Sequence, residues 1–212
     1  ALSAFCIKAT DQLNGAITDL TGVVTSVLPD WDKETQTWID RPTNNPASIF
    51  KAVLQENMIN KPLTDSQIDL KQLQHWHEYC EENGFECNLV IEQPLPLNDL
   101  LGKIASTGRA SPAWLDGKRT VIIDEPKTPK QVVTPRNSWG FSATKTFTDI
   151  PHAWRIPFAN EEKDYLTDEY IVYADGYDVN NATIYETLSF EGVTNPDQIY
   201  KMGKYYHNVA KL

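Results

Sequence analysis

The 212 residues have the composition of an ordinary globular protein, with 41% hydrophobic and 23% charged residues, which is enough apolar material for a core. Nineteen basic against twenty-nine acidic side chains give a net charge of -10, so most of the surface should repel a nucleic-acid backbone. No stretch approaches the roughly 18 consecutive apolar residues that a membrane-spanning helix needs. These features predict a globular chain with no nucleic-acid partner and no membrane insertion.

The chain opens at Ala1 without an initiator Met, and residues 1–5 show no basic region leading into an apolar signal sequence. We therefore expect a piece of a longer protein, synthesised in the cytoplasm. Its three cysteines, Cys6, Cys80 and Cys87, are an odd number and too sparse for a disulfide scaffold, which fits a reducing compartment.

Residues 1–42 are predicted to be a β-rich segment. Residues 4–9 and 22–28 have strand composition, and residues 31–39 suggest a turn that leads into another extended piece. The acidic run at 30–34 resembles the start of a calcium loop, but Thr35 stands where such a loop needs glycine and Arg41 stands at its twelfth position. We interpret this run as a solvated acidic turn.

Residues 43–125 are predicted to be a mixed helix and strand subdomain. Asn45 followed by Pro46 is a helix start, and a second helix should begin near residue 65 or 66 and end at Gly84. A strand is expected over 87–92, then a short helix closed by Gly108, then a hairpin turning at Asp116-Gly117. The apolar faces of the three helices are Ile49, Phe50, Val53 and Leu54, then Leu70, Leu73, Trp76, His77 and Cys80, then Leu97, Leu100, Leu101, Ile104 and Ala105.

Residues 126–212 are predicted to form a small antiparallel sheet with a C-terminal helix. Residues 125–135 carry three prolines and two lysines, which indicates an exposed connector. Strands are expected over 138–144, 153–158, 169–174 and 183–190. Asn195 and Pro196 should start a final helix with Ile199, Met202, Tyr206 and Val209 on one face. The fold class is α+β.

A zinc site is suggested by His75, His77, Cys80 and Cys87. Residues two apart on a helix point about 200° away from each other, so the two histidines cannot share one metal. His77 and Cys80 do share a face, but it is the apolar one. We expect packed side chains and no metal ligand.

Catalytic motifs are also weak. Residues 140–144 (Gly-Phe-Ser-Ala-Thr) lack the closing glycine of a nucleophile elbow and read as a strand, and no glycine-rich phosphate loop occurs. Carboxylates clustered near Tyr165 and Tyr170 could form a glycosidase site, but a solvated face is the simpler interpretation: Glu161, Glu162, Asp164, Asp168 and Glu169. We predict no catalytic, cofactor-binding or metal-binding residue, and no enzyme.

Three segments resemble the central region of phage tail-tip proteins of the host specificity protein J type. They are residues 9–15 (Ala-Thr-Asp-Gln-Leu-Asn-Gly), 41–47 (Arg-Pro-Thr-Asn-Asn-Pro-Ala) and 106–116 (Ser-Thr-Gly-Arg-Ala-Ser-Pro-Ala-Trp-Leu-Asp), and the resemblance covers nearly the whole chain. The order of shorter motifs also matches that family: Asn45-Pro46-Ala47, Cys87-Asn88, Pro112-Ala113-Trp114, Asp116-Gly117 and Phe141-Ser142.

The resemblance implies a virion structural protein, the baseplate hub at the tail tip of a bacteriophage or prophage. Such a hub is a homotrimer in the full-length assembly, closes the tail tube and links it to host-attachment parts. Its partners are other tail proteins, namely the tail tube, distal tail and fibre components. The long N-terminal attachment domains and C-terminal fibre regions of that family are missing from this chain, so we expect the chain alone to be a monomer or weak oligomer.

Two alternatives from other classes remain open. One is a tail-associated cell-wall hydrolase that uses the acidic segment at 161–169. The other is a carbohydrate-binding module, in which exposed tryptophans would stack on sugars; in helices and strands tryptophan is more often part of the core. The six tryptophans are Trp31, Trp38, Trp76, Trp114, Trp139 and Trp154.

Overall fold

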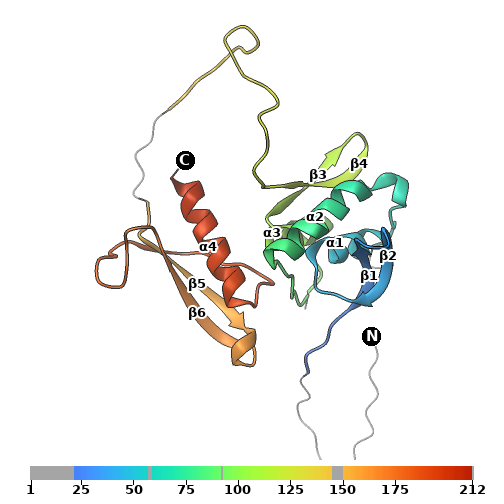
Figure 1. Ribbon diagram of the computed structural model, residues 1–212, viewed down its shortest axis with the longest axis horizontal. Coiled ribbons are helices and arrows are strands. Elements are labelled where there is room, and N and C mark those ends of the chain that lie inside the picture. Colours follow the sequence, from blue (N-terminus) through green and yellow to red (C-terminus); the bar gives the residue numbers. More distant parts are fainter. Residues whose placement is uncertain (1–21, 57–58, 92, 145–149, 212) are drawn as a thin grey trace, which may run out of the picture.

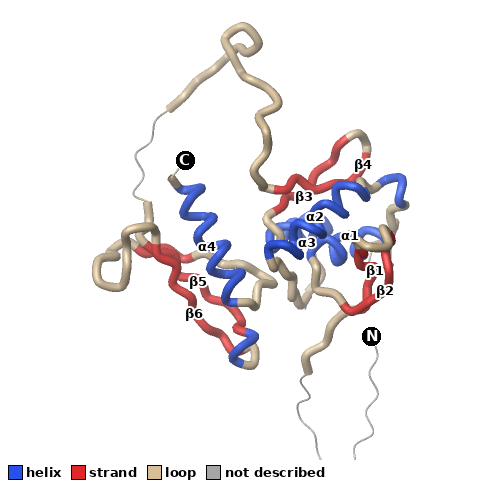
Figure 2. The backbone as a smooth tube through the Cα atoms, viewed as in Figure 1, coloured by secondary structure: helices blue, strands red, loops and turns tan. Residues whose placement is uncertain are grey.

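The computed structural model describes residues 22–56, 59–91, 93–144 and 150–211, and its fold is α+β with a C-terminal helix, as predicted (Figure 1). Its helices and strands form two groups, each with its own hydrophobic core (Figure 2). Within the described residues, every helix is too short or too polar to cross a lipid bilayer. The strand expected over 4–9 lies outside the described residues.

The first group opens with a hairpin of β1 (Val27–Asp32) and β2 (Thr37–Pro42), in which Trp31 faces Trp38 across the antiparallel pair. The strand expected over 22–28 was therefore placed too early. Val23 and Val24 are 72% and 90% exposed, and the part of the chain that the structure describes places no strand opposite them. Strand composition without a pairing partner does not make a strand.

Three helices follow: α1 (Pro46–Gln55), α2 (Leu70–Asn83) and α3 (Leu97–Thr107). Asn45 caps α1 as predicted, because its Oδ1 accepts a hydrogen bond from the Ala47 N–H at 2.9 Å. The start of α2 differs from the prediction, since a short 3-10 turn over Asp65–Gln67 precedes it and Asp69 is its cap. Gly84 ends α2 in the left-handed conformation (φ 65°), which glycine adopts without strain.

The first core lies between these helices. Phe50 and Trp76 meet edge to face at its centre, with ring centroids 5.7 Å apart, and both are fully buried. Of the residues predicted for its apolar faces, Ile49, Leu70, Leu97 and Leu100 are only partly buried and pack at its margin.

The strand expected over 87–92 is absent from the described residues there, and this prediction was wrong. Residues 85–91 run as irregular chain. The Cys87 N–H donates to the Asn44 carbonyl and the Asn88 N–H donates to the Gly192 carbonyl, so successive residues bond two different segments instead of one neighbouring strand. The hairpin that follows is confirmed: β3 (Ala110–Leu115) and β4 (Lys118–Ile123) turn at Asp116 and Gly117, both with positive φ.

After β4, residues 124–144 form a long irregular segment that stands away from both groups (Figure 1). The exposed connector predicted for 125–135 is confirmed, and it continues through residues 138–144, where a strand was expected. That prediction was wrong: among the described residues no second strand lies beside the segment, and Gly140 turns it at φ 70°.

The second group contains β5 (Ala153–Asn160), β6 (Leu166–Tyr173), the short β7 (Tyr185–Thr187) and α4 (Pro196–Ala210). A 3-10 turn over Glu161–Lys163 joins β5 to the antiparallel β6. β7 pairs with β5 in parallel, so the sheet is mixed and not wholly antiparallel.

Helix α4 packs on this sheet with a face rotated from the predicted one. Ile199 and Met202 are buried as expected, but Tyr206 and Val209 are 37% and 43% exposed. Gly203 is buried instead, and it packs so closely on the sheet that a Cβ there would lie 2.7 Å from a methyl carbon of Val172. The glycine thus allows the helix backbone to approach β6.

Candidate functional site

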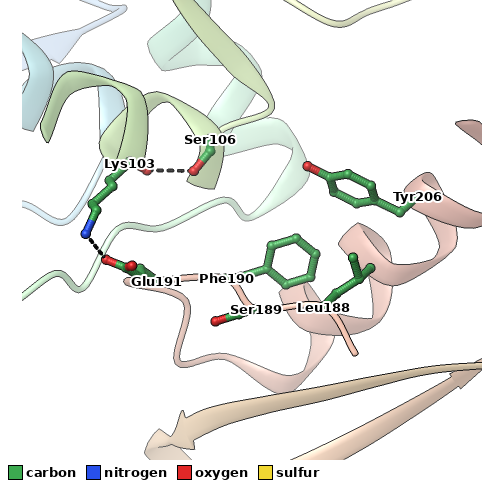
Figure 3. Close-up of a pocket in the computed structure, with 7 residues that line it drawn as sticks. All are labelled: Lys103, Ser106, Leu188, Ser189, Phe190, Glu191 and Tyr206. Atoms are coloured by element: carbon green, nitrogen blue, oxygen red, sulfur yellow. Dashed lines mark hydrogen bonds and ion pairs between the residues drawn. The ribbon is translucent and has the colours of Figure 1, made fainter. Parts of the chain in front are cut away.

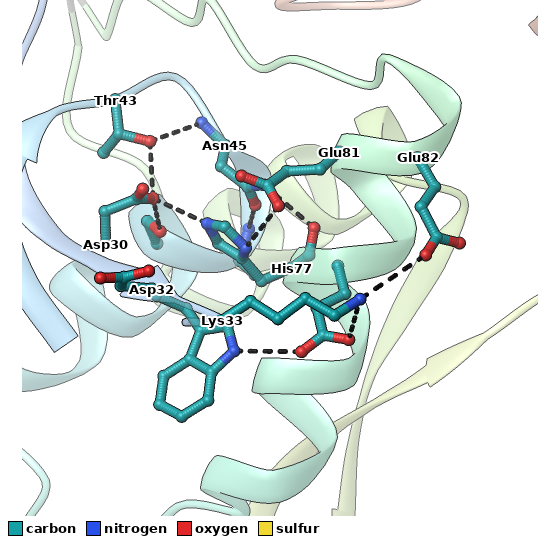
Figure 4. A network of polar contacts seen from close by, with 12 residues as sticks. Asp30, Asp32, Lys33, Thr43, Asn45, His77, Glu81 and Glu82 are labelled. Carbon is teal, nitrogen blue, oxygen red and sulfur yellow. Dashed lines mark hydrogen bonds and ion pairs between the residues drawn. The ribbon is translucent and has the colours of Figure 1, made fainter. Parts of the chain in front are cut away.

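A buried polar network surrounds Asp30 on β1 (Figure 4). Its Oδ1 accepts hydrogen bonds from Ser48 at 2.5 Å and Thr43 at 2.8 Å, and lies 2.8 Å from His77 Nε2. Its Oδ2 accepts from Arg41 Nε at 2.5 Å. One carboxylate therefore binds the first hairpin to α1, α2 and the residues between them.

The charge state of Asp30 follows from these contacts. Burial by itself raises the pKa of this carboxyl. The opposing effects are together larger: they are hydrogen bonds from His77, Ser48 and Thr43 and the electrostatic attraction of His77. The net pKa therefore lies well below the ordinary value. An ionised carboxylate is an acceptor only, so His77 must carry its proton on Nε2.

This network corrects the interpretation of residues 30–34 as a solvated turn. Asp32 is exposed and does sit in the turn, where it accepts from Thr35 Oγ1 at 2.8 Å. Asp30 is 3% exposed. Ser48 and His77 also have no exposed surface, and both converge on the same carboxylate oxygen. The arrangement holds the Ser48 hydroxyl and the His77 ring on Asp30 inside the fold.

The two histidines considered for zinc face different partners in the structure. His75 is an exposed residue whose Nε2 is 3.0 Å from Glu125, whereas His77 points inward to Asp30. Burial raises the pKa of the Cys80 thiol well above its usual value and that of Cys87 to about 11. Among the described residues, no three histidine, cysteine or acidic side chains lie close enough together to hold a metal ion.

The acidic segment at 161–169 is largely engaged in local contacts. Glu161 accepts from Thr194 Oγ1 at 2.7 Å and from Asn195 Nδ2 at 2.9 Å, which joins the turn after β5 to the start of α4. Asp168 accepts from Asn160 and Lys163, both at 2.8 Å. Glu161 and Asp168 thus bind separate sets of donors.

The tryptophans divide into core and surface residues. Trp31, Trp76 and Trp154 are buried, and Trp38 is partly buried against the first core. Trp114 at the end of β3 is 61% exposed with Arg119 over its ring, and Trp139 in the irregular connector is 93% exposed. Residues 140–144, considered as a nucleophile elbow, lie in this same exposed connector.

Residues 126–144, which we call the arm, are the most unusual surface feature. They contain no helix or strand, and long segments of this kind in compact domains usually serve a function or are linkers. Val132, Val133, Trp139 and Phe141 are 73%, 72%, 93% and 85% exposed. Burying a side chain of this size is worth ~1.5–3 kcal/mol, so the arm gains stability wherever a surface covers it.

The arm has a local structure that presents these aromatic rings. The Thr134 N–H donates to Asn137 Oδ1 at 2.6 Å, the Asn137 N–H donates back to the Thr134 carbonyl at 3.0 Å, and Ser138 Oγ donates to the same carbonyl at 2.7 Å. The turn ends directly before Trp139. Both aromatic residues therefore follow a turn that is already formed.

The arm also differs in charge from the rest of the chain. It carries Lys127, Lys130 and Arg136 and no acidic residue, a charge of +3. Because the whole chain has a net charge of -10, the remainder has -13. A basic, aromatic segment is thus attached to an acidic body.

A shallow groove lies where the two groups of elements meet (Figure 3). It consists of two hollows of about 250 and 220 Å³ that are both lined by Lys103 and Glu191, which form an ion pair of 2.5 Å. The first hollow is completed by Ser106, Leu188, Ser189, Phe190 and Tyr206, and the second by Leu89, Val90, Ile91, Gln93 and Leu95.

Sequence reasoning missed both the arm's aromatic residues, which were assigned to a strand, and the Asp30 network. A signal for the network existed in the sequence, because the apolar Leu28 and Trp31 flank Asp30 at short range. The groove gives no such signal, since its lining residues come from segments distant in sequence. No protein-family model matches this chain, and no curated protein matches it in sequence.

Proposed function

We propose that this chain is a structural component of a phage or prophage tail tip, similar to the baseplate hub of the host specificity protein J type. It would close the tail tube and connect it to host-attachment parts in the virion. The exposed arm carries this proposal, because an aromatic, basic segment outside both cores suits a protein that is buried among neighbouring subunits.

The motifs that resemble the hub family support the proposal through their positions. Asn45-Pro46-Ala47 starts α1, Pro112-Ala113-Trp114 lies in β3, Asp116-Gly117 turns the hairpin, and Phe141-Ser142 lies in the arm. The first three motifs form a helix start, a strand and a turn, so the fold accounts for their residues. Phe141 is 85% exposed, so packing within this chain does not account for a phenylalanine at this position.

Purified particles test the proposal. Antibodies against the chain should label the tip of the tail in negative-stain electron microscopy, and mass spectrometry should find the protein in particles purified through a density gradient. Deleting its gene should abolish infectivity, and supplying the gene from a plasmid should restore it. Infectious particles that lack the protein would refute a structural role.

A second candidate, a carbohydrate-binding module, is favoured by one observation, the exposure of Trp139 and Trp114. Sedimentation with purified cell walls distinguishes it from the hub. Binding that is lost in both Trp139→Ala and Trp114→Ala would support the module, whereas the hub proposal expects no sedimentation with walls. For the hydrolase alternative, zymography on peptidoglycan should show no clearing if the hub proposal is correct.

A further inference from the structure

We propose that the arm of one copy of this chain docks in the groove of a second copy, with Trp139 and Phe141 entering its two hollows. The inference deepens the proposed function, since it names a neighbour for the arm in a tail part built from several copies. It is tested on the purified chain, so its failure is distinguishable from failure of the tail-tip role.

The groove has dimensions that suit two side chains better than one ligand. Its hollows of about 250 and 220 Å³ are each smaller than the ~300–1,000 Å³ of usual small-molecule pockets. Trp139 and Phe141 are two residues apart, so their Cα atoms lie at most about 7 Å from each other. Two aromatic rings at this short spacing match two hollows that share a wall.

The walls of the groove are chemically complementary to the arm. Phe190 and Tyr206 line the first hollow, and their rings pack 5.5 Å apart, which leaves aromatic surface for a third ring. Val90 and Ile91, which line the second hollow, are 80% and 49% exposed.

Charge adds to this match. The Glu191 side chain at the shared wall is 56% exposed although Lys103 pairs with it, so it can also accept a basic group. Arg136 lies three residues before Trp139 and belongs to an arm that carries +3 on a chain whose remainder carries -13.

A second copy is the occupant that fits the arrangement of the two features. The arm follows Glu125, which pairs with His75 on its own body, and residues 126–144 arc away from that body (Figure 1). An arm and a groove on different parts of one surface make a heterologous contact, which closes copies into a ring if the rotation allows it.

Cross-linking between two differently tagged copies tests the contact. The first copy carries Ser142→Cys beside Phe141, the second carries Ser189→Cys in the groove, and both carry Cys6→Ser. Both replaced serines at 142 and 189 are exposed, whereas the native Cys80 and Cys87 are buried. After mild oxidation, a disulfide-linked heterodimer of the two tags should form on non-reducing gels.

Two controls make the result specific. A second copy with Ser111→Cys, an exposed serine on β3 outside the groove, should give at least tenfold less heterodimer. The heterodimer should fall to the same low level when the first copy also carries Trp139→Ala and Phe141→Ala. It should fall equally when the second copy also carries Glu191→Lys. Because Trp139 and Phe141 are almost fully exposed, the double variant should keep the circular dichroism spectrum and melting temperature of the parent.

Three outcomes would overturn the inference. The first is equal cross-linking of the Ser189→Cys and Ser111→Cys copies. The second is a heterodimer that still forms when both aromatic rings are removed. The third is a chain that carries both Ser142→Cys and Ser189→Cys and closes only an internal disulfide. The last result would place the arm in its own groove.

Discussion

The side-chain amide of Gln198 pairs with both backbone groups of Glu86. Its Oε1 accepts from the Glu86 N–H at 3.1 Å, and its Nε2 donates to the Glu86 carbonyl at 3.0 Å and to the Thr107 carbonyl at 3.0 Å. Gln198 lies on α4 and is 1% exposed, so one buried amide joins the C-terminal helix to the first group of elements. The wall of the groove depends on this junction.

Gln198→Leu should therefore destabilise the chain. Leucine has a similar size but leaves the Glu86 N–H and two carbonyls without partners in a buried place, and each unpaired group costs ~1–3 kcal/mol. Urea unfolding should show the loss, while Gln131→Leu on the exposed arm should change the free energy of unfolding by less than about 0.5 kcal/mol. Equal stability of the two variants would mean that the junction is unimportant.

Asp30 should make the stability depend on acidic pH. Because its folded pKa lies below the ordinary value of 3.8, the unfolded chain binds its proton first as the pH falls. The stabilisation is complete above the unfolded pKa and is lost as the pH falls from about 4 toward the folded pKa. Unfolding free energies measured between pH 7 and pH 3 should therefore decrease less steeply in Asp30→Asn than in the parent.

At neutral pH the same variant should be less stable by ~1.5–3 kcal/mol, because the charge-assisted hydrogen bonds from the buried Ser48 and His77 to this carboxylate are weakened or lost. Asp32→Asn is the matched control, since Asp32 is exposed two residues away. If both variants lost the same stability, the buried network would not be what holds the first hairpin to α1 and α2.

Asn45→Ala should cost ~0.5–2 kcal/mol through loss of the α1 cap. The structure adds a second bond, from Asn45 Nδ2 to the His77 carbonyl at 3.2 Å, so Asn45→Asp should keep the cap, lose this bond and fall between the parent and the alanine variant. Thermal unfolding gives the order. An unchanged melting temperature with lost binding to a tail partner would instead indicate a binding residue.

We expect no metal in the purified chain. His77 is turned to Asp30, and His75 to Glu125, so the two rings do not converge. Elemental analysis of protein prepared without chelator should find less than ~0.1 zinc per chain, because a structural zinc site needs four converging ligands. One zinc per chain that disappears in His77→Ala would contradict this expectation.

The isolated chain should be a monomer or weak oligomer in dilute solution. An arm in a shallow groove covers less than the ~1,200–2,000 Å² of a stable interface, and a net charge of -10 adds repulsion between copies. Light scattering coupled to size exclusion at micromolar concentration should give a mass near 24.0 kDa. A stable trimer would show that this chain alone carries the main interface.

The sequence by itself determined the features that depend on neighbouring residues. The caps at Asn45 and Asn195, the end of α2 at Gly84 and the turn at Asp116-Gly117 were all predictable, because each is decided by backbone conformation and hydrogen bonds within a few positions. The fold class followed from these elements.

Only the tertiary structure decided which extended segments became strands and which polar groups were buried. Residues 87–91 and 138–144 have strand composition, but a strand needs a partner, and none lies beside either segment within the described chain. The acidic run around Asp30 predicted a solvated side chain, but in the structure four donors from distant positions in the sequence surround its carboxylate. The groove likewise arises from long-range packing, which no local pattern in the sequence encodes, whereas the rings of the arm are exposed because the arm lies outside both cores.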